Sequence, residues 1–383
     1  MKICLYTDTA LPTIGGHEMV VDALARQYQQ LGHEVLVLAP RHSKPWRMRD
    51  RQLPYRMVRH PRFVSTRKFL SWYRFALLGL DRRHKFDVVH AHGVYPAAYV
   101  ASLCLPQTSW PLVITSHGGD VNPHNHRLQN PLLRARHVQA LEAASSLVAI
   151  SPATHDGYLA LAPGLTKKIV EIGNGTDVEG LASPVERPAT VDAAIRSKEY
   201  ALFLGRLTYQ KGADVLLHAL TRLPGTGRVQ LVIAGDGPER HALEQLAREL
   251  NLQDRVRFVG MISGEEKNYL LQNALFGVFP SREFEGLGLV TLDSFAAGNP
   301  VIASALPGPA AVVRPDETGL LVAEHAPQAW ADAMQRFFSG RDYAARLGQQ
   351  AAQVVRSSSW RAVAEQHLAL YDQLLRQSVP KAA

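Results

Sequence analysis

Two carboxylates stand eight positions apart at the ends of a glycine-rich, otherwise apolar stretch, SREFEGLGLVTLD, which covers residues 281–293. The acids are Glu285 and Asp293. We predict that the stretch follows a strand and that residues 287–298 form a helix, which separates the acids by about two turns. They would then face one cleft without having to touch. Acids separated in this way suit the hydroxyl pairs of two sugars.

The start of the predicted helix offers backbone N–H groups as well as acids. The amides of Gly286, Leu287, Gly288 and Leu289 would be exposed there. A helix N-terminus attracts phosphate through its free N–H groups and its dipole. The sequence therefore predicts a phosphate site beside the two acids.

A pair of cations follows another predicted strand. In GRLTYQKG, Arg206 and Lys211 stand five residues apart after the strand 200–205. Two fixed cations near a helix start form a clamp for a doubly charged group such as a diphosphate. Arg and Lys also solvate many exposed loops. However, ligands of open α/β sheets bind at the carboxyl ends of strands, and this position favours the clamp.

Three further strand-to-helix loops have weaker patterns. Gly15 and Gly16 could let amides approach a phosphate, although a tight turn is the simpler interpretation, and neither a P-loop nor a G-x-G-x-x-G motif is present. In AGDGPER, Asp236 stands between glycines, and a turn is favoured. In SHGGD, His117 has room for a ligand, although a single histidine is more often structural.

The motif HAHG raises the possibility of a metal site. His90 and His92 fall on one face of a predicted strand, and no third ligand follows at a usual spacing. We expect no metal.

The elements that position these loops alternate between apolar runs and amphipathic stretches. In residues 18–32, for example, Val21, Leu24 and Tyr28 share one helical face. Strand, helix, strand at this cadence predicts an α/β fold with two Rossmann-like, doubly wound domains facing across a cleft. Buried parallel strands are expected at 2–7, 33–40, 87–93, 111–119, 146–152, 200–205, 229–235, 255–260, 274–281, 300–304 and 318–322.

The expected domain boundary lies in a stretch of different texture. Residues 177–199 contain two prolines and no sustained periodicity, which is typical of a linker and crossover. We therefore place an N-terminal domain at 1–177 and a C-terminal domain at 178–359. Helices are also expected at 213–223, 238–251 and 360–377.

Composition agrees with this organisation. A chain of 383 residues exceeds what one core usually serves, and its 46% hydrophobic and 20% charged residues argue against disorder. Two cysteines are too few to stabilise a chain of this length by disulfide bonds, so the cysteine content fits a reducing cytoplasm best. The opening apolar run is too short for a signal peptide, and no stretch approaches the ~18 apolar residues that a membrane-spanning helix needs.

The formal net charge of +8 is unevenly distributed. Between Arg41 and Lys85 lie fourteen Lys or Arg residues, only two acids and seven interleaved aromatic residues. This mixture suits an anionic membrane, because bases are attracted to anionic lipid and aromatic rings prefer the headgroup level. Nucleic acid is a second candidate, and a solvated basic face with inward-packed aromatics is a third interpretation.

Taken together, the motifs resemble those of a known family: the retaining, nucleotide-sugar-dependent glycosyltransferases of the GT-B fold, glycosyltransferase family 4, also called glycosyl transferases group 1. That family has two acids separated by seven residues, as in EGLGLVTLDSFAAGNPVIAS here. The likeness extends over nearly the whole chain and includes GRLTYQKG, AGDGPER, IGNGTD, the early Gly-Gly pair, SHGGD, TGLLV and the final SW…LYDQLL.

The resemblance implies a role for each matching residue of the second domain. Arg206 and Lys211 would hold the diphosphate and stabilise the departing nucleoside diphosphate. Glu285 would bind hydroxyls of the donor sugar, and Asp293 would bind the ribose hydroxyls. Asp236 would be a further donor-binding residue.

The first domain would complete the donor site. Gly15 and Gly16 would approach the phosphates, His117 would lie beside the transferred sugar, and Asn174 of IGNGTD would bind the donor. The resemblance also implies that the helix 360–377 packs back on the first domain and that the domains close over the donor. It implies no divalent metal, no cofactor and retention by front-face attack, in which the leaving phosphate oxygen takes the proton of the acceptor.

Two positions depart from the family pattern. Asp293 stands where the family usually has Glu, which shortens the arm that reaches the ribose. Residues 305–313, ALPGPAAVV, replace the usual Gly-Gly followed by Glu. The loop on the sugar side is therefore expected to be reshaped.

The leading hypothesis is a cytoplasmic glycosyltransferase, peripheral at the inner face of the membrane through residues 41–85. It would transfer sugar from a UDP- or GDP-linked donor to a glycan or lipid-linked acceptor in cell-surface polysaccharide, lipopolysaccharide or glycolipid synthesis. A nucleotide-sugar 2-epimerase of the same architecture and a non-catalytic binding protein are the alternatives. No nucleic-acid partner is expected.

Overall fold

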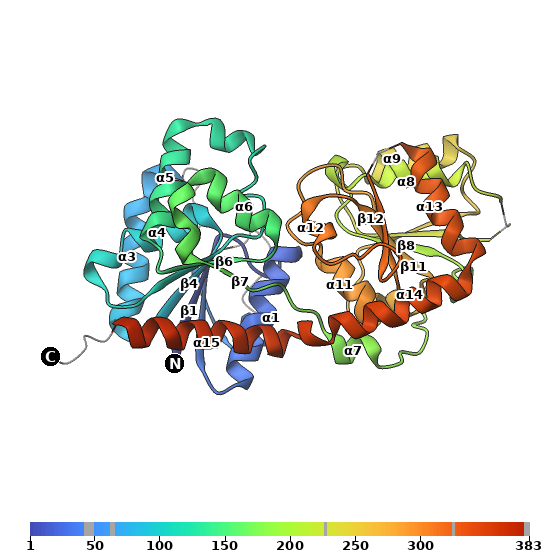
Figure 1. Cartoon of the computed structure of the whole chain (residues 1–383). Helices are drawn as coiled ribbons and strands as arrows, with labels where there is room; N and C mark the ends of the chain where they lie inside the picture. Colours follow the sequence, from blue (N-terminus) through green and yellow to red (C-terminus); the bar gives the residue numbers. More distant parts are fainter. Residues whose placement is uncertain (42–49, 62–65, 226–227, 324–325, 379–383) are drawn as a thin grey trace. The chain divides into compact units, whose positions relative to one another are not determined.

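The computed structural model describes residues 1–41, 50–61, 66–225, 228–323 and 326–378, with side chains described from residue 69 onward in the third range. The chain divides into two compact units (Figure 1). The first comprises Met1–Gly175 and Trp360–Ala383, and the second comprises Thr176–Ser359. Each unit is an α/β layer structure around one parallel sheet, as the alternation of apolar runs and amphipathic stretches predicts.

The first unit contains a seven-stranded parallel sheet with the order β3-β2-β1-β4-β5-β6-β7. The chain order reverses between β1 and β4, so the loops that follow these two strands lie at the switch point where α/β sheets usually bind ligands. The strands are β1 (Lys2–Thr7), β2 (Glu34–Pro40), β3 (Arg56–His60), β4 (Val88–His92), β5 (Leu112–Thr115), β6 (Ser146–Ala149) and β7 (Ile169–Glu171).

Helix α1 (Gly16–Gln30) packs its apolar face on this sheet, where Leu24 and Tyr28 are fully buried. It ends as predicted, because Gly32 adopts a φ of +84° that interrupts the helix. The last helix, α15 (Trp360–Ser378), packs beside α1 (Figure 1). The other helices of the unit are α3 (Thr66–His84), α4 (Tyr99–Ser102), α5 (Pro131–Ala143) and α6 (Pro152–Leu161).

The second unit contains a six-stranded parallel sheet with the order β10-β9-β8-β11-β12-β13, and its switch point lies between β8 and β11. Every strand falls within a stretch in which the sequence predicts one. The strands are β8 (Ala201–Leu204), β9 (Leu231–Ala234), β10 (Val256–Gly260), β11 (Phe276–Phe279), β12 (Val301–Ser304) and β13 (Gly319–Val322).

Large aromatic side chains fill the core of the second unit. Trp330, Phe276 and Phe337 are fully buried, and the rings of the two phenylalanines lie 5.1 Å apart. The helices are α7 (Val178–Ala182), α8 (Ala213–Leu220), α9 (Arg240–Glu249), α10 (Glu265–Asn273), α11 (Leu289–Ala296), α12 (Pro307–Ala310), α13 (Pro327–Ser339) and α14 (Arg341–Val354).

The stretch 177–199, which the sequence predicts as a linker and crossover, lies within the second unit and begins with α7. The Gln272 side-chain amide on α10 donates to the carbonyl oxygens of Leu181 at 3.0 Å and Ser183 at 2.6 Å. These bonds hold the stretch against the body of the unit. Among the described helices, none is both long and apolar enough to cross a membrane.

Candidate active site

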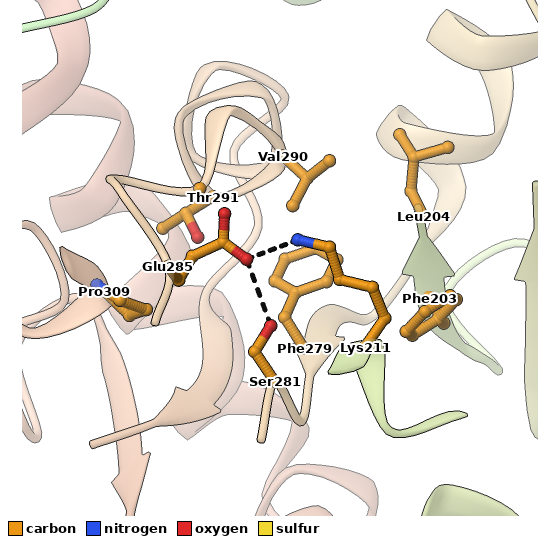
Figure 2. A pocket seen from close by; sticks show the side chains of 10 residues that line it. Phe203, Leu204, Lys211, Phe279, Ser281, Glu285, Val290, Thr291 and Pro309 are labelled. Carbon is orange, nitrogen blue, oxygen red and sulfur yellow. Dashed lines mark hydrogen bonds and ion pairs between the residues drawn. The ribbon is translucent and has the colours of Figure 1, made fainter. Parts of the chain in front are cut away.

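A pocket opens at the carboxyl ends of β8 and β11 in the second unit, and Glu285 lies at its centre (Figure 2). The Lys211 ammonium and the Ser281 hydroxyl both donate to the same Glu285 carboxylate oxygen, the hydroxyl at 3.2 Å. Phe203, Phe279 and Pro309 supply apolar walls. The pocket thus combines a carboxylate, an ammonium and a hydroxyl at the edge of the sheet where the sequence predicts ligand chemistry.

Glu285 sits on an irregular loop that glycine residues make possible. Gly288 caps α11 with a φ of +81°, a conformation that L side chains rarely adopt. Gly308 of α12 lies so close that an added Cβ would be 2.0 Å from the carbonyl oxygen of Glu285. The reshaped stretch 305–313 therefore packs directly against the backbone of the acid.

The predicted phosphate-binding amides only partly coincide with the helix start. Helix α11 begins at Leu289, so Gly286 and Leu287 belong to the loop that precedes it. Gly288 and Leu289 stand at the cap and first position, where N–H groups have no partner within the helix. Gly288 also lines the pocket.

The cation loop lies beside the acid. Lys211 ends a 3-10 turn, and Gly212, with a φ of +68°, caps α8. An added Cβ on Gly212 would be 2.2 Å from the carbonyl oxygen of Pro280, so a glycine is required for the two loops to approach. Arg206 is exposed and forms no ion pair with the described residues. Lys211 therefore contacts Glu285, while Arg206 faces solvent.

Arg282, which is not among the predicted site residues, joins the two loops of the pocket. Its guanidinium donates to both carboxylate oxygens of Asp214 on α8, at 2.7 and 2.6 Å, and to the Tyr209 carbonyl oxygen at 2.9 Å. The Tyr209 ring lies 4.4 Å from the guanidinium. Bonding to Asp214 raises the pKa of Arg282. The one sequence signal for Arg282 is its position directly after Ser281, at the carboxyl end of a predicted strand.

Asp293 is not among the residues that line the pocket. Its two oxygens have separate partners: the Thr176 hydroxyl donates to one at 2.6 Å, and the Lys267 ammonium lies 2.6 Å from the other. The sequence predicts that the two acids need not touch, and each acid has its own lysine. Neither Lys267 nor Thr176 stands at a spacing that would have identified it.

Asp236 behaves as its turn motif predicts. Its side chain accepts a hydrogen bond from the Gly237 amide at 2.8 Å, and Arg240 lies 3.8 Å away. The flanking Gly235 and Gly237 pass so close to the backbone of Gly205 and Leu207 that a Cβ on either would collide. The turn therefore brings Asp236 next to the loop that bears Arg206.

In the first unit, the predicted phosphate-binding glycines lie after β1, at the switch point. Gly15 precedes α1 in extended backbone, and Gly16 is the first residue of the helix. The Glu18 carboxylate lies over Gly15, since an added Cβ would be 2.7 Å from its oxygen, and it accepts a hydrogen bond from the Thr9 hydroxyl at 2.6 Å. This region is therefore closely packed around an acid.

His117 belongs to a group of histidines from separate segments of the first unit. Its Nε2 lies 3.0 Å from His92 Nδ1, and its ring stacks on that of His17 at 4.2 Å. Burial, followed by the proximity of these two histidines, lowers the pKa of His117 well below its usual value. The Nε2 of His92 is buried with no partner in the described part of the chain. The sequence pattern predicts His90 and His92 on one strand face but gives no sign of this group.

The histidine group continues inward to the last helix. His90 lies 2.6 Å from the Tyr371 hydroxyl and 2.7 Å from the Thr115 hydroxyl, and Tyr371 lies 3.1 Å from the hydroxyl of Tyr28. Asn174, in the loop that follows β7, is also buried. Within the described residues, no three His, Cys, Asp or Glu side chains are arranged to hold a metal ion.

Comparisons with known proteins define the class to which this fold and pocket belong. Residues 191–354 match the family model of Glycosyl transferases group 1, and residues 14–179 match that of Glycosyltransferase Family 4. Each match covers most of one unit. The protein is thus of the glycosyltransferase class with the GT-B fold, and the chain belongs to glycosyltransferase family 4.

Individual relatives agree with this assignment. Glycogen synthase from Mycobacterium tuberculosis is 32% identical over 305 residues, which cover 76% of this chain and 70% of the relative. D-inositol 3-phosphate glycosyltransferase from a Nocardioides species is 32% identical over 311 residues, covering 75% and 67%. The structure of HepE from Anabaena in complex with UDP has a TM-score of 0.82 at 19% identity, covering 97% of this chain and 100% of HepE. This last likeness shows the fold.

Proposed function

We propose that this glycosyltransferase transfers a sugar, with retention, from a UDP-linked donor to a glycan or lipid-linked acceptor in the synthesis of a cell-surface polysaccharide, lipopolysaccharide or glycolipid. The observation that carries the proposal is the pocket in which Lys211 and Glu285 meet at the carboxyl edge of the second sheet. UDP is favoured over GDP because HepE was solved with UDP and with UDP-glucose.

In the proposed reaction, the bond between the anomeric carbon and the β-phosphate oxygen breaks. The acceptor oxygen bonds to the same face of that carbon, and its proton passes to the departing phosphate oxygen. Lys211 and Arg206 stabilise the negative charge that develops on the phosphate. Lys211 would turn from Glu285 toward this oxygen, which leaves Glu285 to accept bonds from sugar hydroxyls. No protein base and no metal takes part.

Further residues complete the proposed donor site. Asp293 binds the ribose, while Asp236 and the amides near Gly288 lie toward the phosphates. The first unit contributes the amides of Gly15 and Gly16, and His117 beside the sugar. Asn174 is proposed as another donor contact. With its pKa lowered, His117 stays neutral at pH 7 and offers a hydrogen bond rather than a charge.

A thermal-shift titration with UDP, GDP, ADP and their sugars tests the donor site. A ligand at ~100 times its Kd adds about 2.7 kcal/mol of stability. UDP should stabilise the wild type, the double variant Arg206→Ala, Lys211→Ala should lose the shift, and Arg248→Ala on the exposed side of α9 should keep it. No shift with any nucleotide would contradict the proposal, and conversion of the donor without acceptor would instead indicate an epimerase.

We further propose that the first unit binds the inner face of the membrane through α3. Phe75 on this helix is 72% exposed, and Arg82, Arg83 and Lys85 at its end are also exposed. Other members of the basic segment serve the fold, since the buried guanidinium of Arg59 binds Asp50 at 2.8 Å. Residues 42–49, including Trp46, and the side chain of Phe63 lie outside the described residues.

Co-sedimentation with vesicles tests this attachment. The protein should bind vesicles that contain phosphatidylglycerol, and binding should weaken at high salt because the bases are screened. Phe75→Ser should reduce the bound fraction severalfold, while Tyr209→Ser, which removes an exposed aromatic ring from the second unit, should not. Equal binding to neutral vesicles would contradict an electrostatic attachment.

A further inference from the structure

Asp293, the second acid, forms an ion pair whose cation has no assigned role. Lys267 on α10 places its ammonium 2.6 Å from one Asp293 oxygen, and the Thr176 hydroxyl donates to the other oxygen at 2.6 Å. All three residues belong to the second unit. The acid is thus held by one neutral donor and one charged donor.

The pair remains open to a ligand. The side chain of Lys267 is 31% exposed and that of Asp293 is 14% exposed, so the ammonium is the more accessible partner. A lysine ammonium has three protons, and the Asp293 contact uses one of them. A carboxylate oxygen accepts about two hydrogen bonds, so each Asp293 oxygen keeps capacity after its present bond.

The chemistry of the pair matches a vicinal diol. Asp293 can only accept hydrogen bonds when ionised, and Lys267 can only donate them. A diol offers one hydroxyl as donor and its neighbour as acceptor, so it can satisfy both side chains at once. A sugar that lacks one of the hydroxyls would leave either the charge of Lys267 or that of Asp293 without its ligand partner.

From this geometry we infer that Lys267 determines specificity for the sugar of the nucleotide, in that it selects ribonucleotide over 2′-deoxyribonucleotide donors. The inference rests on the proposed function, which places the donor ribose at Asp293. Lys267 donates to the 2′-hydroxyl of the ribose, while Asp293 accepts from the 3′-hydroxyl. Donors built on a deoxynucleotide, such as thymidine diphosphate sugars, then bind weakly although their diphosphate fits Arg206 and Lys211.

Calorimetric titration of the full chain with UDP and with 2′-deoxy-UDP tests this role. Wild type should bind UDP at least tenfold more tightly than 2′-deoxy-UDP, as expected for loss of one charge-assisted hydrogen bond. Lys267→Met should weaken UDP binding about tenfold and leave 2′-deoxy-UDP within about threefold, so that the preference disappears. Lys267→Arg, which keeps a donor and the charge, should retain most of the preference.

A matched control separates specificity from structure. Arg257→Met also removes a cation from an ion pair of this unit, since Arg257 binds Asp192 at 2.9 Å, and it should leave the UDP preference unchanged. If Lys267→Met weakens the binding of both nucleotides equally, or of neither, the ion pair only joins α10 to α11. Either result would overturn the inference. If wild type binds UDP and 2′-deoxy-UDP equally, ribose selection is also wrong. Binding of neither nucleotide to wild type would instead overturn the proposed function.

Discussion

The two units place different chemistry at the carboxyl ends of similar parallel sheets. In the first unit, histidines contact one another, a tyrosine and a threonine in a mostly buried group, and the acid Glu18 is buried as well. In the second unit, acids pair with lysines and arginines on partly exposed loops and helices. Similar layers of strands and helices thus support an interior network in one unit and an ionic surface in the other.

The difference follows from the cost of burying charge. Burial favours the neutral form of a histidine, and it is the leading cause that lowers the pKa of His90, His92 and His367, in the last case to about 3. The pairs of the second unit keep contact with solvent, so both partners remain charged without a large desolvation cost. Protons should therefore act mainly on the first unit, and charge substitutions mainly on the second.

Acidification should affect the first unit more than the second, and this is the largest effect that we expect. The lowered pKa values mean that the unfolded chain binds protons below about pH 6.5, before the folded histidines do. The free energy of unfolding therefore keeps its full contribution from the neutral buried histidines above pH 6.5. As the pH falls from 6.5 toward the folded pKa values, this free energy decreases by about 1.4 kcal/mol per histidine and pH unit. Hydrogen exchange at pH 7.5 and 5.5, corrected for intrinsic rates, should show loss of protection in the first unit.

The His367→Leu variant tests whether the buried histidines cause this acid sensitivity. His367 Nδ1 has no hydrogen-bond partner among the described residues, so His367→Leu removes a titrating group without breaking a bond at that nitrogen. The acid sensitivity of the first unit should become shallower in this variant. Equal loss of protection in both units of the wild type would contradict the comparison.

Glu285→Gln tests the charge at the centre of the second site. Glutamine keeps the shape of the side chain but cannot pair ionically with Lys211. Turnover of the UDP-sugar should fall by about 10²- to 10³-fold, the usual cost of losing a preorganised polar group, while UDP affinity changes less than about threefold. Glu283→Gln, two residues away and exposed, should retain activity. A fully active Glu285→Gln protein would rule out the role of the acid.

Arg282→Ala should have a smaller effect, because Arg282 supports the loops without lying in the pocket. Its loss frees Asp214 and the Tyr209 carbonyl, so UDP affinity measured by calorimetry should fall about tenfold, or ~1.4 kcal/mol. Arg282→Lys keeps the charge but loses the bidentate bond to Asp214. Its UDP affinity should therefore lie between those of the wild type and Arg282→Ala. Unchanged affinity in Arg282→Ala would show that the loops are held by other contacts.

Ser281→Ala should have the smallest effect. It removes one hydrogen bond to Glu285 at 3.2 Å and leaves Lys211 in place. Turnover should fall by about threefold, equivalent to ~0.7 kcal/mol, within the range of a single neutral donor. A loss as large as that of Glu285→Gln would show that the hydroxyl, rather than the lysine, positions the acid.

Most strands that the sequence predicts are buried along nearly their whole length. In the second sheet, β8, β9, β11, β12 and β13 are near-continuous apolar runs, which the pattern identifies directly. The half-buried edge strand β10 is interrupted only by Arg257, so its apolar run is still recognisable. The two strands it misses, β3 and β7, are the edges of the first sheet. There, Arg56 and Glu171 are exposed and the apolar run is broken, so neither stretch differs from a loop by composition.

The candidate site is predictable only where one loop carries its residues. Glu285 and the capping Gly288 follow from their local stretch, and so does the turn at Asp236. The ion pairs do not, because Lys211 and Glu285 lie 74 positions apart in the chain and are joined only by the order of the strands. The histidine group is assembled in the same way from the segments that carry His17, His92 and His117.

The path of the chain through the two units also sets an order of assembly. The second unit is one uninterrupted stretch, Thr176–Ser359, whereas the first needs the residues on both sides of it. During synthesis, the second unit can therefore fold as soon as it has emerged from the ribosome. The first unit cannot be completed until α15 is made, because Tyr28 and His90 gain their partner Tyr371 only after the whole second unit has been synthesised. Of the two units, the one whose synthesis starts earlier is thus the one that is completed later.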